Sequence, residues 1–421
     1  MDALYARFDE RVGICSDSRH LEAGQIFFAL KGERFDGHDF VSHALAQGAS
    51  AVVIEEIPEG LDLQDKRIFL VRSVLETLQN LARHHRRQWG KPVIALTGSN
   101  GKTTVKELFA AVLGNMLPIH ATKGNFNNHL GVPITLLQIQ SKHELAIVEM
   151  GANHQGEIQK LCQIAEPSLG YITNFGRAHL EGFGGMEGVI KGKTELYRYL
   201  QAQGGQILVN PNDPLQVAHG GDGAFAFAEA LQTWMEDDGF VHIGDGRCEV
   251  KTHLSGSYQG DNLKAAWSLG LRFGMKPENI CSGLQSYIPR NNRGEIRQTE
   301  HNIVFLDAYN ANPSSMEASF LYALECHKEL PHIYIAGDLF ELGEYTDFEH
   351  QRMVDLFAHH GARNVWLIGQ AFCKTNHPTE YQCFKTTEAA LDALQGSQIK
   401  NSFIWVKGSR GMALEKLLPA L

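Results

Sequence analysis

Short apolar runs alternate with helical patterns along most of this 421-residue chain. Residues 93–96 are apolar and are followed by Gly98, which is typical of a buried parallel strand that ends in a turn. Apolar residues then recur with the spacing of one helix face, at Val105, Leu108, Phe109, Val112 and Leu113. A buried strand followed by an amphipathic helix is the repeating unit of α/β sheets, so the pattern predicts an α/β fold.

The runs that we predict as strands gather in three groups along the chain. They lie at 25–30, 51–54 and 67–71, then at 93–96, 146–148, 169–172 and 206–209, and finally at 303–306, 333–336, 365–368 and 403–406. Predicted helices over 74–89 and 187–200 lie between them, and Gly90-Lys91-Pro92 separates the first group from the second. The Gly-rich, alternating stretch 219–256 predicts hairpins.

This grouping predicts three domains. We expect a small α/β N-terminal domain over 1–89 and a C-terminal Rossmann-like domain over 297–421. The central domain, over 90–296, is expected to be of the P-loop type, with a mostly parallel sheet flanked by helices. Several domains also suit the length, because single hydrophobic cores rarely grow to this size.

Composition and charge exclude several classes of partner. The chain has 38 Lys and Arg against 48 Asp and Glu, a net charge of −10, so no basic field collects nucleic acid or anionic membranes. No apolar run approaches the roughly 18 residues of a membrane span, and the first residues lack the pattern of a signal peptide. The 7 scattered cysteines include no C-x-x-C, which favours reduced thiols and a cytoplasmic protein.

The strongest chemical signal is the loop Thr-Gly-Ser-Asn-Gly-Lys-Thr-Thr at 97–104, between a predicted strand and a predicted helix. Backbone N–H groups of such a loop wrap a phosphate chain at a helix N-terminus. Lys102 would reach the β- and γ-phosphates, and Thr103 would offer its hydroxyl to Mg²⁺. Leu96 stands where the general G-x-x-x-x-G-K-[ST] motif has its first glycine, so this loop is tighter than the loop of that motif. The predicted phosphate-binding residues are Gly98, Ser99, Asn100, Gly101, Lys102, Thr103 and Thr104.

Polar residues near the ends of the central strands are further candidates. Glu149 directly follows a predicted strand, where it is either a Mg²⁺ ligand or a helix cap. A lone histidine such as His179 is more often structural than a ligand. Lys191 and Lys193 lie on a predicted helix, and each is a phosphate clamp, an exposed cation, or an amine that reacts with CO₂ to become a carboxylate.

Two polar segments favour binding over simple connection. The amide-rich loop 125–128 (Asn-Phe-Asn-Asn) is too dense in asparagine for an ordinary connector, although asparagine also favours turns. In the C-terminal region, polar clusters follow three predicted strands, at 307–313, 337–343 and 407–410, which predicts a second ligand surface. Arg410 would suit a carboxylate or a phosphate. The basic run 83–87 is a phosphate patch or a solvated helix end, and we favour the solvated end.

Together these motifs resemble the Mur ligase family, over almost the whole chain from Ser16-Asp17-Ser18-Arg19 to Lys407-Gly408-Ser409-Arg410. The loop 97–104 is shared by Mur ligases and folylpolyglutamate synthases, whereas segments 125–128, 149–153, 307–316 and 337–343 carry the more specific resemblance. The resemblance implies an ATP-dependent ligase that joins D-alanyl-D-alanine to UDP-N-acetylmuramoyl-tripeptide through an acyl phosphate. It also implies domain closure around the substrates and no nucleic-acid partner.

The resemblance assigns roles to individual residues. Thr103, Glu149, His179 and Lys193 would belong to a site for two Mg²⁺ ions, with Lys193 carbamylated and Lys191 as the fallback, and Lys102, Lys193 and His179 would be catalytic. ATP would also contact Asn262, Asp307 and Tyr309. The residues implied for the UDP substrate are Ser16, Asp17, Ser18, Arg19, Lys31, Asp36, Gly37, His38, Asn125, Asn127 and Asn128. Those implied for D-alanyl-D-alanine are Asp338, Glu341, Lys407, Ser409 and Arg410.

Other functions remain as alternatives at the level of sequence. One is the Mur ligase that adds the third amino acid, although its Asp-Asn-Pro-Arg motif is absent from the C-terminal region. Another is a regulatory P-loop ATPase, and a third is a binding module without catalysis. We expect a monomer, and the sequence does not identify the third residue of the tripeptide.

Overall fold

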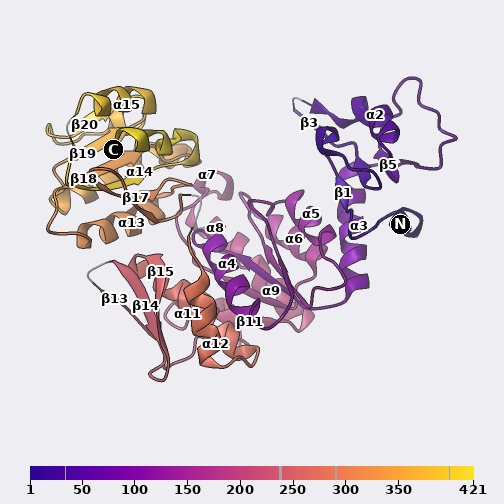
Figure 1. The fold of residues 1–421 in the computed structure, drawn as a ribbon, viewed down its shortest axis with the longest axis horizontal. Coiled ribbons are helices and arrows are strands. Elements are labelled where there is room, and N and C mark those ends of the chain that lie inside the picture. The colour runs from indigo at the N-terminus through magenta and orange to yellow at the C-terminus, as the bar shows by residue number, and fades with distance from the viewer. Residues whose placement is uncertain (34, 237–238, 290–291, 398) are drawn as a thin grey trace.

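The computed structural model describes residues 1–33, 35–236, 239–289, 292–397 and 399–421. The N-terminal and C-terminal domains lie on opposite sides of the central domain, as the indigo and yellow ends of the ribbon show (Figure 1). No helix in these ranges is long and apolar enough to cross a membrane.

The N-terminal domain is built on a parallel sheet of order β1-β2-β5-β6. Its elements are α1 (Asp2–Tyr5), β1 (Ile14–Cys15), β2 (Ile26–Phe28), the hairpin strands β3 (Lys31–Gly32) and β4 (Phe35–Asp36), α2 (Val41–Ala46), β5 (Ala51–Ile54), β6 (Ile68–Leu70) and α3 (Val74–Trp89). The N-cap Ser73 accepts a hydrogen bond from the N–H of Glu76, and Gly90 ends α3 with a φ of 71°, so the helix has the predicted bounds.

The basic run on α3 fastens this helix to the central domain. The ring of buried His85 bonds the Ile139 carbonyl at 2.8 Å, and buried Arg86 donates to the Ala165 carbonyl at 2.9 Å. Arg87 pairs with Glu166 at the surface. The interpretation as a solvated helix end is therefore wrong for His85 and Arg86, whose polar groups satisfy buried carbonyls of the neighbouring domain.

The central domain contains a wholly parallel six-stranded sheet of order β12-β11-β10-β7-β9-β8. Its strands are β7 (Val93–Thr97), β8 (Ile119–Ala121), β9 (Leu145–Glu149), β10 (Leu169–Ile172), β11 (Gln206–Val209) and β12 (Phe225–Ala226). Its helices are α4 (Lys102–Leu113), α5 (Gly131–Leu137), α6 (Glu157–Ala165), α7 (Leu180–Phe183), α8 (Met186–Lys193), α9 (Glu195–Gln203), α10 (Pro214–Gly220), α11 (Gly260–Arg272) and α12 (Pro277–Ser286).

Both faces of this sheet are buried, as the apolar run predicts. Along β7, Val93 and Ala95 belong to one hydrophobic core, whereas Ile94 and Leu96 belong to the other. Two predictions need correction here. The single helix expected over 187–200 is divided at Thr194 into α8 and α9. The hairpin stretch also contributes β12 to the parallel sheet, and only β13 (Gln232–Met235), β14 (Phe240–Gly244) and β15 (Glu249–Ser255) are antiparallel.

The C-terminal domain contains a second six-stranded sheet, of order β16-β17-β21-β18-β19-β20. Its strands are β16 (Glu295–Gln298), β17 (Ile303–Asp307), β18 (His332–Gly337), β19 (Val365–Ile368), β20 (Gln382–Phe384) and β21 (Phe403–Lys407), and its helices are α13 (Pro313–Glu325), α14 (Thr346–His359) and α15 (Thr387–Gln395). All neighbours are parallel except the edge pair β16–β17. The expected three-part α/β architecture is thus confirmed, with an antiparallel edge that the pattern did not predict.

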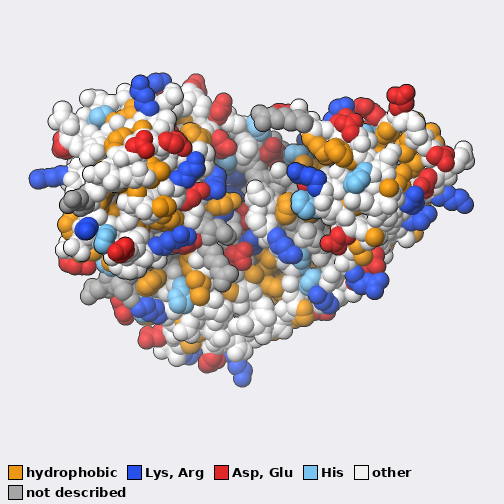
Figure 2. Space-filling model, turned by 45° about the horizontal axis from the view of Figure 1, so that its top comes forward, with side chains coloured by type: hydrophobic (Ala, Val, Ile, Leu, Met, Phe, Trp, Pro, Cys, Tyr) orange, Lys and Arg blue, Asp and Glu red, His pale blue; other side chains and the backbone are white. Residues whose placement is uncertain are grey.

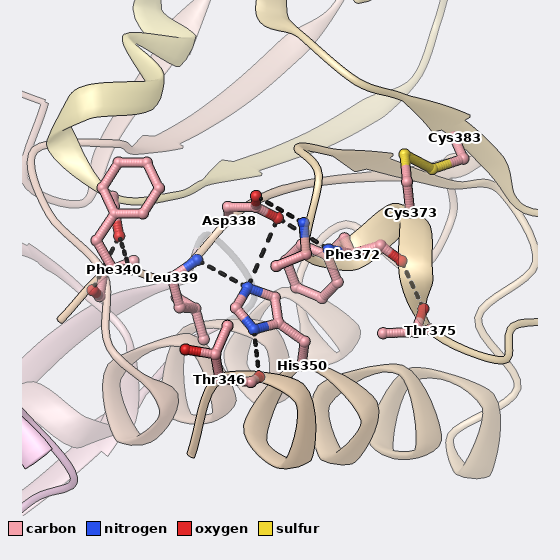
Figure 3. Close-up of polar contacts among 12 residues, drawn as sticks. Asp338, Leu339, Phe340, Thr346, His350, Phe372, Cys373, Thr375 and Cys383 are labelled. Carbon is pink, nitrogen blue, oxygen red and sulfur yellow. Dashed lines mark hydrogen bonds and ion pairs between the residues drawn. A yellow bond between two sulfur atoms is a disulfide. The ribbon is translucent and has the colours of Figure 1, made fainter. Parts of the chain in front are cut away.

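One cysteine pair is bonded in the structure, so the expectation of reduced thiols is wrong for Cys373 and Cys383. Cys373 and Cys383 are joined where the short helix η5 (Phe372–Lys374) packs beside β20, with Cα atoms 5.7 Å apart (Figure 3). Cys248 and Cys281 lie close together, but their Cα atoms are 7.2 Å apart, farther than a disulfide bridges without backbone movement. Cys15, Cys162 and Cys326 are free and buried. The packing of η5 against the next strand, β20, creates the bonded pair, which spacing alone does not reveal.

His120 makes the stability of the central domain sensitive to acid. Burial on β8, with a smaller contribution from neighbouring His143, lowers the pKa of His120 to about 4. The unfolded chain, with a histidine pKa of about 6.5, binds more protons between these values, so stability falls as the pH drops from about 6.5 towards 4. We expect wild-type protein to lose about 2 kcal/mol between pH 7 and pH 5 through this group, and His120→Gln to lose correspondingly less, as measured by urea unfolding.

The matched control is His253→Gln, at an exposed histidine on β15. This variant is expected to keep the wild-type pH dependence. Equal acid sensitivity of wild type and His120→Gln would show that His120 is not the responsible group.

Candidate active site

A cavity of about 1070 Å³ is lined by residues from all three domains. Figure 2 shows the molecular surface hollowed between the two outer domains. The register of the central sheet explains why polar groups meet here. Leu96 pairs with Glu149, and Thr97 pairs with Ile172, so β7, β9 and β10 end at the same edge, where parallel α/β sheets bind their ligands.

The loop 97–104 forms the predicted turn between β7 and α4. Gly98 has a φ of 140°, and a Cβ atom there would overlap the Thr173 hydroxyl. Gly101, with a φ of 78°, precedes the first residue of α4.

The Lys102 ammonium donates to the carbonyls of Gly98 and Ser99, at 2.7 and 3.2 Å. Burial lowers the pKa of Lys102, and the charge of Glu149 partly raises it. The cradle therefore holds a cation beside free helix N–H groups, which favours a phosphate.

Asn100 joins this loop to two other parts of the protein. Its N–H donates to the Asn174 side chain at 3.1 Å, and its side-chain oxygen accepts from Asn312 at 2.6 Å. Asn312 also caps α13 by accepting from the Ser315 N–H. The phosphate loop is thus bonded directly to the first helix of the C-terminal domain.

Glu149 lies at the end of β9 with 2% of its surface exposed. Its Oε1 atom accepts from the Asn127 amide at 2.8 Å, whereas its Oε2 atom is buried and has no hydrogen-bond partner in the part of the chain that the structure describes. The predicted amide loop thus reaches the predicted carboxylate. Asn128 instead accepts from the N–H groups of Leu130 and Gly131 at the start of α5, and Asn125 is exposed.

His179 links the site to the C-terminal domain. It has a φ of 53° and directly precedes α7, and its Nδ1 atom pairs with the carboxylate of Glu341. This contact, followed by the charge of His179, lowers the pKa of Glu341. Glu341, predicted to contact D-alanyl-D-alanine, therefore faces a predicted metal ligand across the domain interface.

The two candidate lysines of α8 lie in different environments. Lys193 is 1% exposed, and its ammonium donates to the Ala152 carbonyl at 3.2 Å and lies 4.9 Å from the Phe183 ring centroid. Burial, reinforced by the charge of Lys102, lowers the pKa of Lys193 well below its usual value. Lys191 is exposed. Only Lys193 thus has surroundings that favour a neutral amine.

The C-terminal domain contributes three predicted residues to the cavity. Asp307 and Lys407 are paired by sheet register and by an ion pair, and both line the cavity together with Tyr309. Asn262 of α11 lies against the phosphate loop, because a Cβ atom at Gly101 would be 3.0 Å from its side-chain oxygen.

Other predicted ligand residues are engaged within their own domains. The buried Asp338 carboxylate accepts N–H groups of Ala371 and Phe372, the Ser409 hydroxyl accepts the N–H of Phe340, and Arg410 pairs with Glu415 at 2.7 Å.

The N-terminal candidates lie away from the cavity, and none of them is among the described residues that line it. Asp17 pairs with Arg19 next to Ser16 and the buried Ser18, and Asp36 pairs with Lys31 and His38 beside the closely packed Gly37.

Sequence reasoning missed several residues that line the cavity. The Arg293 guanidinium lies 3.5 Å from the centroid of the Tyr309 ring, and Asn174 holds the phosphate loop. Asn174 follows a predicted strand, so its position was a usable signal. Arg293 lies between the central and C-terminal sheets, where no periodic pattern marks it. Arg83 lines the cavity from α3, although the run that contains it was interpreted as solvated.

This fold and this cavity define a three-domain nucleotide-dependent ligase, and the chain belongs to the Mur ligase family. The matching family descriptions are the Mur ligase family catalytic domain over residues 11–86, the Mur ligase middle domain over 96–270, and the Mur ligase glutamate ligase domain over 292–410.

Full-length relatives point to one branch of this family. A UDP-N-acetylmuramoyl-tripeptide–D-alanyl-D-alanine ligase of Bacillus subtilis is 32% identical, over 97% of this chain and 93% of that protein. A crystal structure of MurF from Acinetobacter baumannii is similar at 32% identity, with a TM-score of 0.86 over 96% of this chain and 92% of that one. MurF from Thermotoga maritima in complex with ADP has 26% identity and a TM-score of 0.85 over 98% and 97%.

The geometry of Gly98 predicts the effect of a single methyl group. Gly98→Ala would force an unfavourable φ and displace Thr173 from the loop, so we expect ADP affinity to fall at least tenfold in titration calorimetry. The control is Gly204→Ala, also at positive φ but with no atom within 4 Å of the added methyl. Unchanged ADP affinity of Gly98→Ala would contradict the assignment of this loop to the phosphates.

Proposed function

We propose that this ligase joins D-alanyl-D-alanine to UDP-N-acetylmuramoyl-tripeptide, consuming ATP and releasing ADP and phosphate. The observation that carries the proposal is the single cavity in which the phosphate loop, Glu149 and the Asp307–Lys407 pair meet. The names of the full-length relatives supply the two substrates. Because the reaction consumes ATP, we place it in the cytoplasm. We also propose a monomer as the active unit, because residues from all three domains of one chain line the cavity.

The reaction has two steps. A carboxylate of the tripeptide attacks the γ-phosphorus of ATP, forming an acyl phosphate and breaking the bond to ADP. The free amine of D-alanyl-D-alanine then attacks the acyl carbon. The resulting tetrahedral intermediate loses a proton and expels phosphate, leaving the new amide. Lys102 bonds the transferring phosphoryl group, where its charge stabilises the transition state, and the walls of the cavity align the reactants.

Glu149, Thr103 and His179 are proposed to hold Mg²⁺. The unpartnered Oε2 atom of Glu149 fits this role, because a buried carboxylate oxygen without a hydrogen bond is costly unless a ligand satisfies it. A carboxylate and a hydroxyl suit this ion, whereas imidazole is a less typical ligand. When bound, two Mg²⁺ ions would neutralise the charge of the triphosphate.

Lys193 is proposed to be carbamylated. Its neutral amine would attack CO₂ and lose a proton, which converts a buried cation into a carboxylate. Two observations support this step: the amine is buried and next to Lys102, and the other candidate, Lys191, is exposed. The negative product would also offset the nearby positive charge of Lys102.

Substrate binding is proposed to require domain closure. The UDP-binding candidates Asp17, Arg19 and Lys31 lie on the N-terminal domain outside the cavity, whereas Asn127 is already at its wall. Rotation of the outer domains towards the centre would bring both sets onto one substrate. The roles of Asp338, Ser409 and Arg410 in binding D-alanyl-D-alanine belong to the same proposal.

Phosphate release tests the reaction directly. With ATP and Mg²⁺, we expect one phosphate per amide only when both substrates are present, and at least a hundredfold slower release from Lys102→Ala with unchanged thermal stability. Release without either substrate would instead indicate a regulatory ATPase. Release that requires a UDP-dipeptide and a diamino acid would indicate the family member that acts one step earlier.

Added short carboxylic acids should restore ligase activity to a variant that lacks Lys193. Lys193→Ala is expected to lose at least 95% of ligase activity, because no carbamate forms, and millimolar short carboxylic acids are expected to restore part of it. Lys191→Ala is the matched control on the same helix and should remain active without added acid. Rescue of Lys191→Ala instead would transfer the carbamylation proposal to Lys191.

A further inference from the structure

The segment 338–343 is the part of the C-terminal domain that meets His179 of the central domain. Besides the pair between Glu341 and His179, the Glu341 carbonyl accepts the N–H of Glu181 at 3.4 Å. Gly343 approaches Glu181 so closely that an added Cβ atom would lie 2.9 Å from its Cγ atom. This segment also lines a second cavity of about 370 Å³.

The backbone of this segment is strained. Glu341 has a φ of 61°, a left-handed conformation that is unfavourable for a residue with a Cβ atom. Such a conformation persists only where the surrounding contacts hold it in place. Besides the contacts with the central domain, groups within the C-terminal domain hold the segment.

His350 holds the start of the segment. Its Nε2 atom lies 3.0 Å from the N–H of Leu339, and its Nδ1 atom lies 2.7 Å from the Thr346 carbonyl oxygen (Figure 3). A backbone N–H can only donate and a carbonyl can only accept, so Nε2 carries the lone pair and Nδ1 carries the proton. Burial lowers the pKa of His350, which agrees with this neutral ring.

Three further bonds complete the support. The Thr346 hydroxyl donates to the Gly343 carbonyl at 2.7 Å, at the other end of the segment. The Asp338 carboxylate accepts two N–H groups of the η5 region, and its oxygen lies 3.6 Å from the His350 ring. His350 is fully buried and also packs its edge against Phe372, with centroids 4.6 Å apart. Thus α14 holds both ends of the segment, one end through His350 and the other through Thr346.

We propose that His350 is a positioning residue for the acceptor side of the reaction: by accepting the Leu339 N–H, it holds segment 338–343 in the conformation that presents Glu341 to His179. His350 acts through the segment and touches no reacting group. The inference rests on the proposed function for its kinetic readout, whereas its structural readout is independent of any substrate.

The experiment compares His350→Phe, which removes both hydrogen bonds but keeps a ring, with His350→Gln, which keeps an acceptor near the position of Nε2. We expect His350→Phe to raise the KM for D-alanyl-D-alanine about tenfold while the KM for ATP changes less than twofold, because the phosphate loop lies in another domain. His350→Gln is expected to recover most of this loss. Hydrogen exchange should show faster exchange of the Leu339 amide in His350→Phe.

The matched control is His332→Phe, at the opposite end of β18. His332 also bonds through both ring nitrogens, to Tyr334 and to the His327 carbonyl, and its replacement should leave the KM for D-alanyl-D-alanine unchanged. ADP affinity, measured for each variant, verifies that the protein is folded.

The outcomes separate the two proposals. A wild-type protein that does not ligate D-alanyl-D-alanine refutes the proposed function, and the exchange of the Leu339 amide then decides the role of His350 by itself. A wild-type protein that does ligate it, combined with wild-type KM and exchange in His350→Phe, overturns the inference. An equal rise in the KM for ATP would also overturn it, because it would indicate a general loss of structure.

Discussion

Parallel strands all end at the same edge of their sheet, and the site of this ligase depends on that constraint. In the central sheet the ends of β7, β9 and β10 bring together the phosphate loop, Glu149 and Asn174. In the C-terminal sheet the register places Asp307 beside Lys407. Both edges contribute to one cavity. Residues far apart in sequence are therefore concentrated by backbone hydrogen bonding alone, before any side chain contacts another.

Several charged side chains of the site are buried because the strand ends gather them in one place. Among the described residues, the hydrogen bonds of Lys102 go to loop carbonyls, at 2.7 and 3.2 Å, and that of Lys193 goes to the Ala152 carbonyl. One oxygen of Glu149 has no hydrogen-bond partner among these residues. Isolated buried charges are costly, so these groups gain most when a triphosphate, a metal ion or a carbamate supplies opposite charge. The free protein already holds these charged groups in position, so they need little rearrangement when the substrates bind, and the site is preorganised.

The two outer domains are attached to the centre in different ways. The N-terminal domain is fastened through buried groups of α3, where His85 and Arg86 satisfy carbonyls of the central domain. The C-terminal domain meets the centre through polar contacts at the cavity, such as Asn100 with Asn312 and His179 with Glu341. The Tyr258 ring also packs against the Tyr322 ring at this interface. Polar contacts exchange readily with water, so this second interface suits a domain that opens and closes around substrates.

Local patterns in the chain were enough to predict the three-part α/β architecture and the phosphate loop, because apolar periodicity and a glycine loop before a helix are local signals. They did not determine which polar groups share one space. In the tertiary structure Lys193 is buried and Lys191 is exposed, Arg86 of α3 bonds a carbonyl of the central domain, and the Asp338 carboxylate bonds the η5 region. Burial, and with it the pKa and the hydrogen-bond partner of each group, arises from elements that pack together although the chain separates them widely.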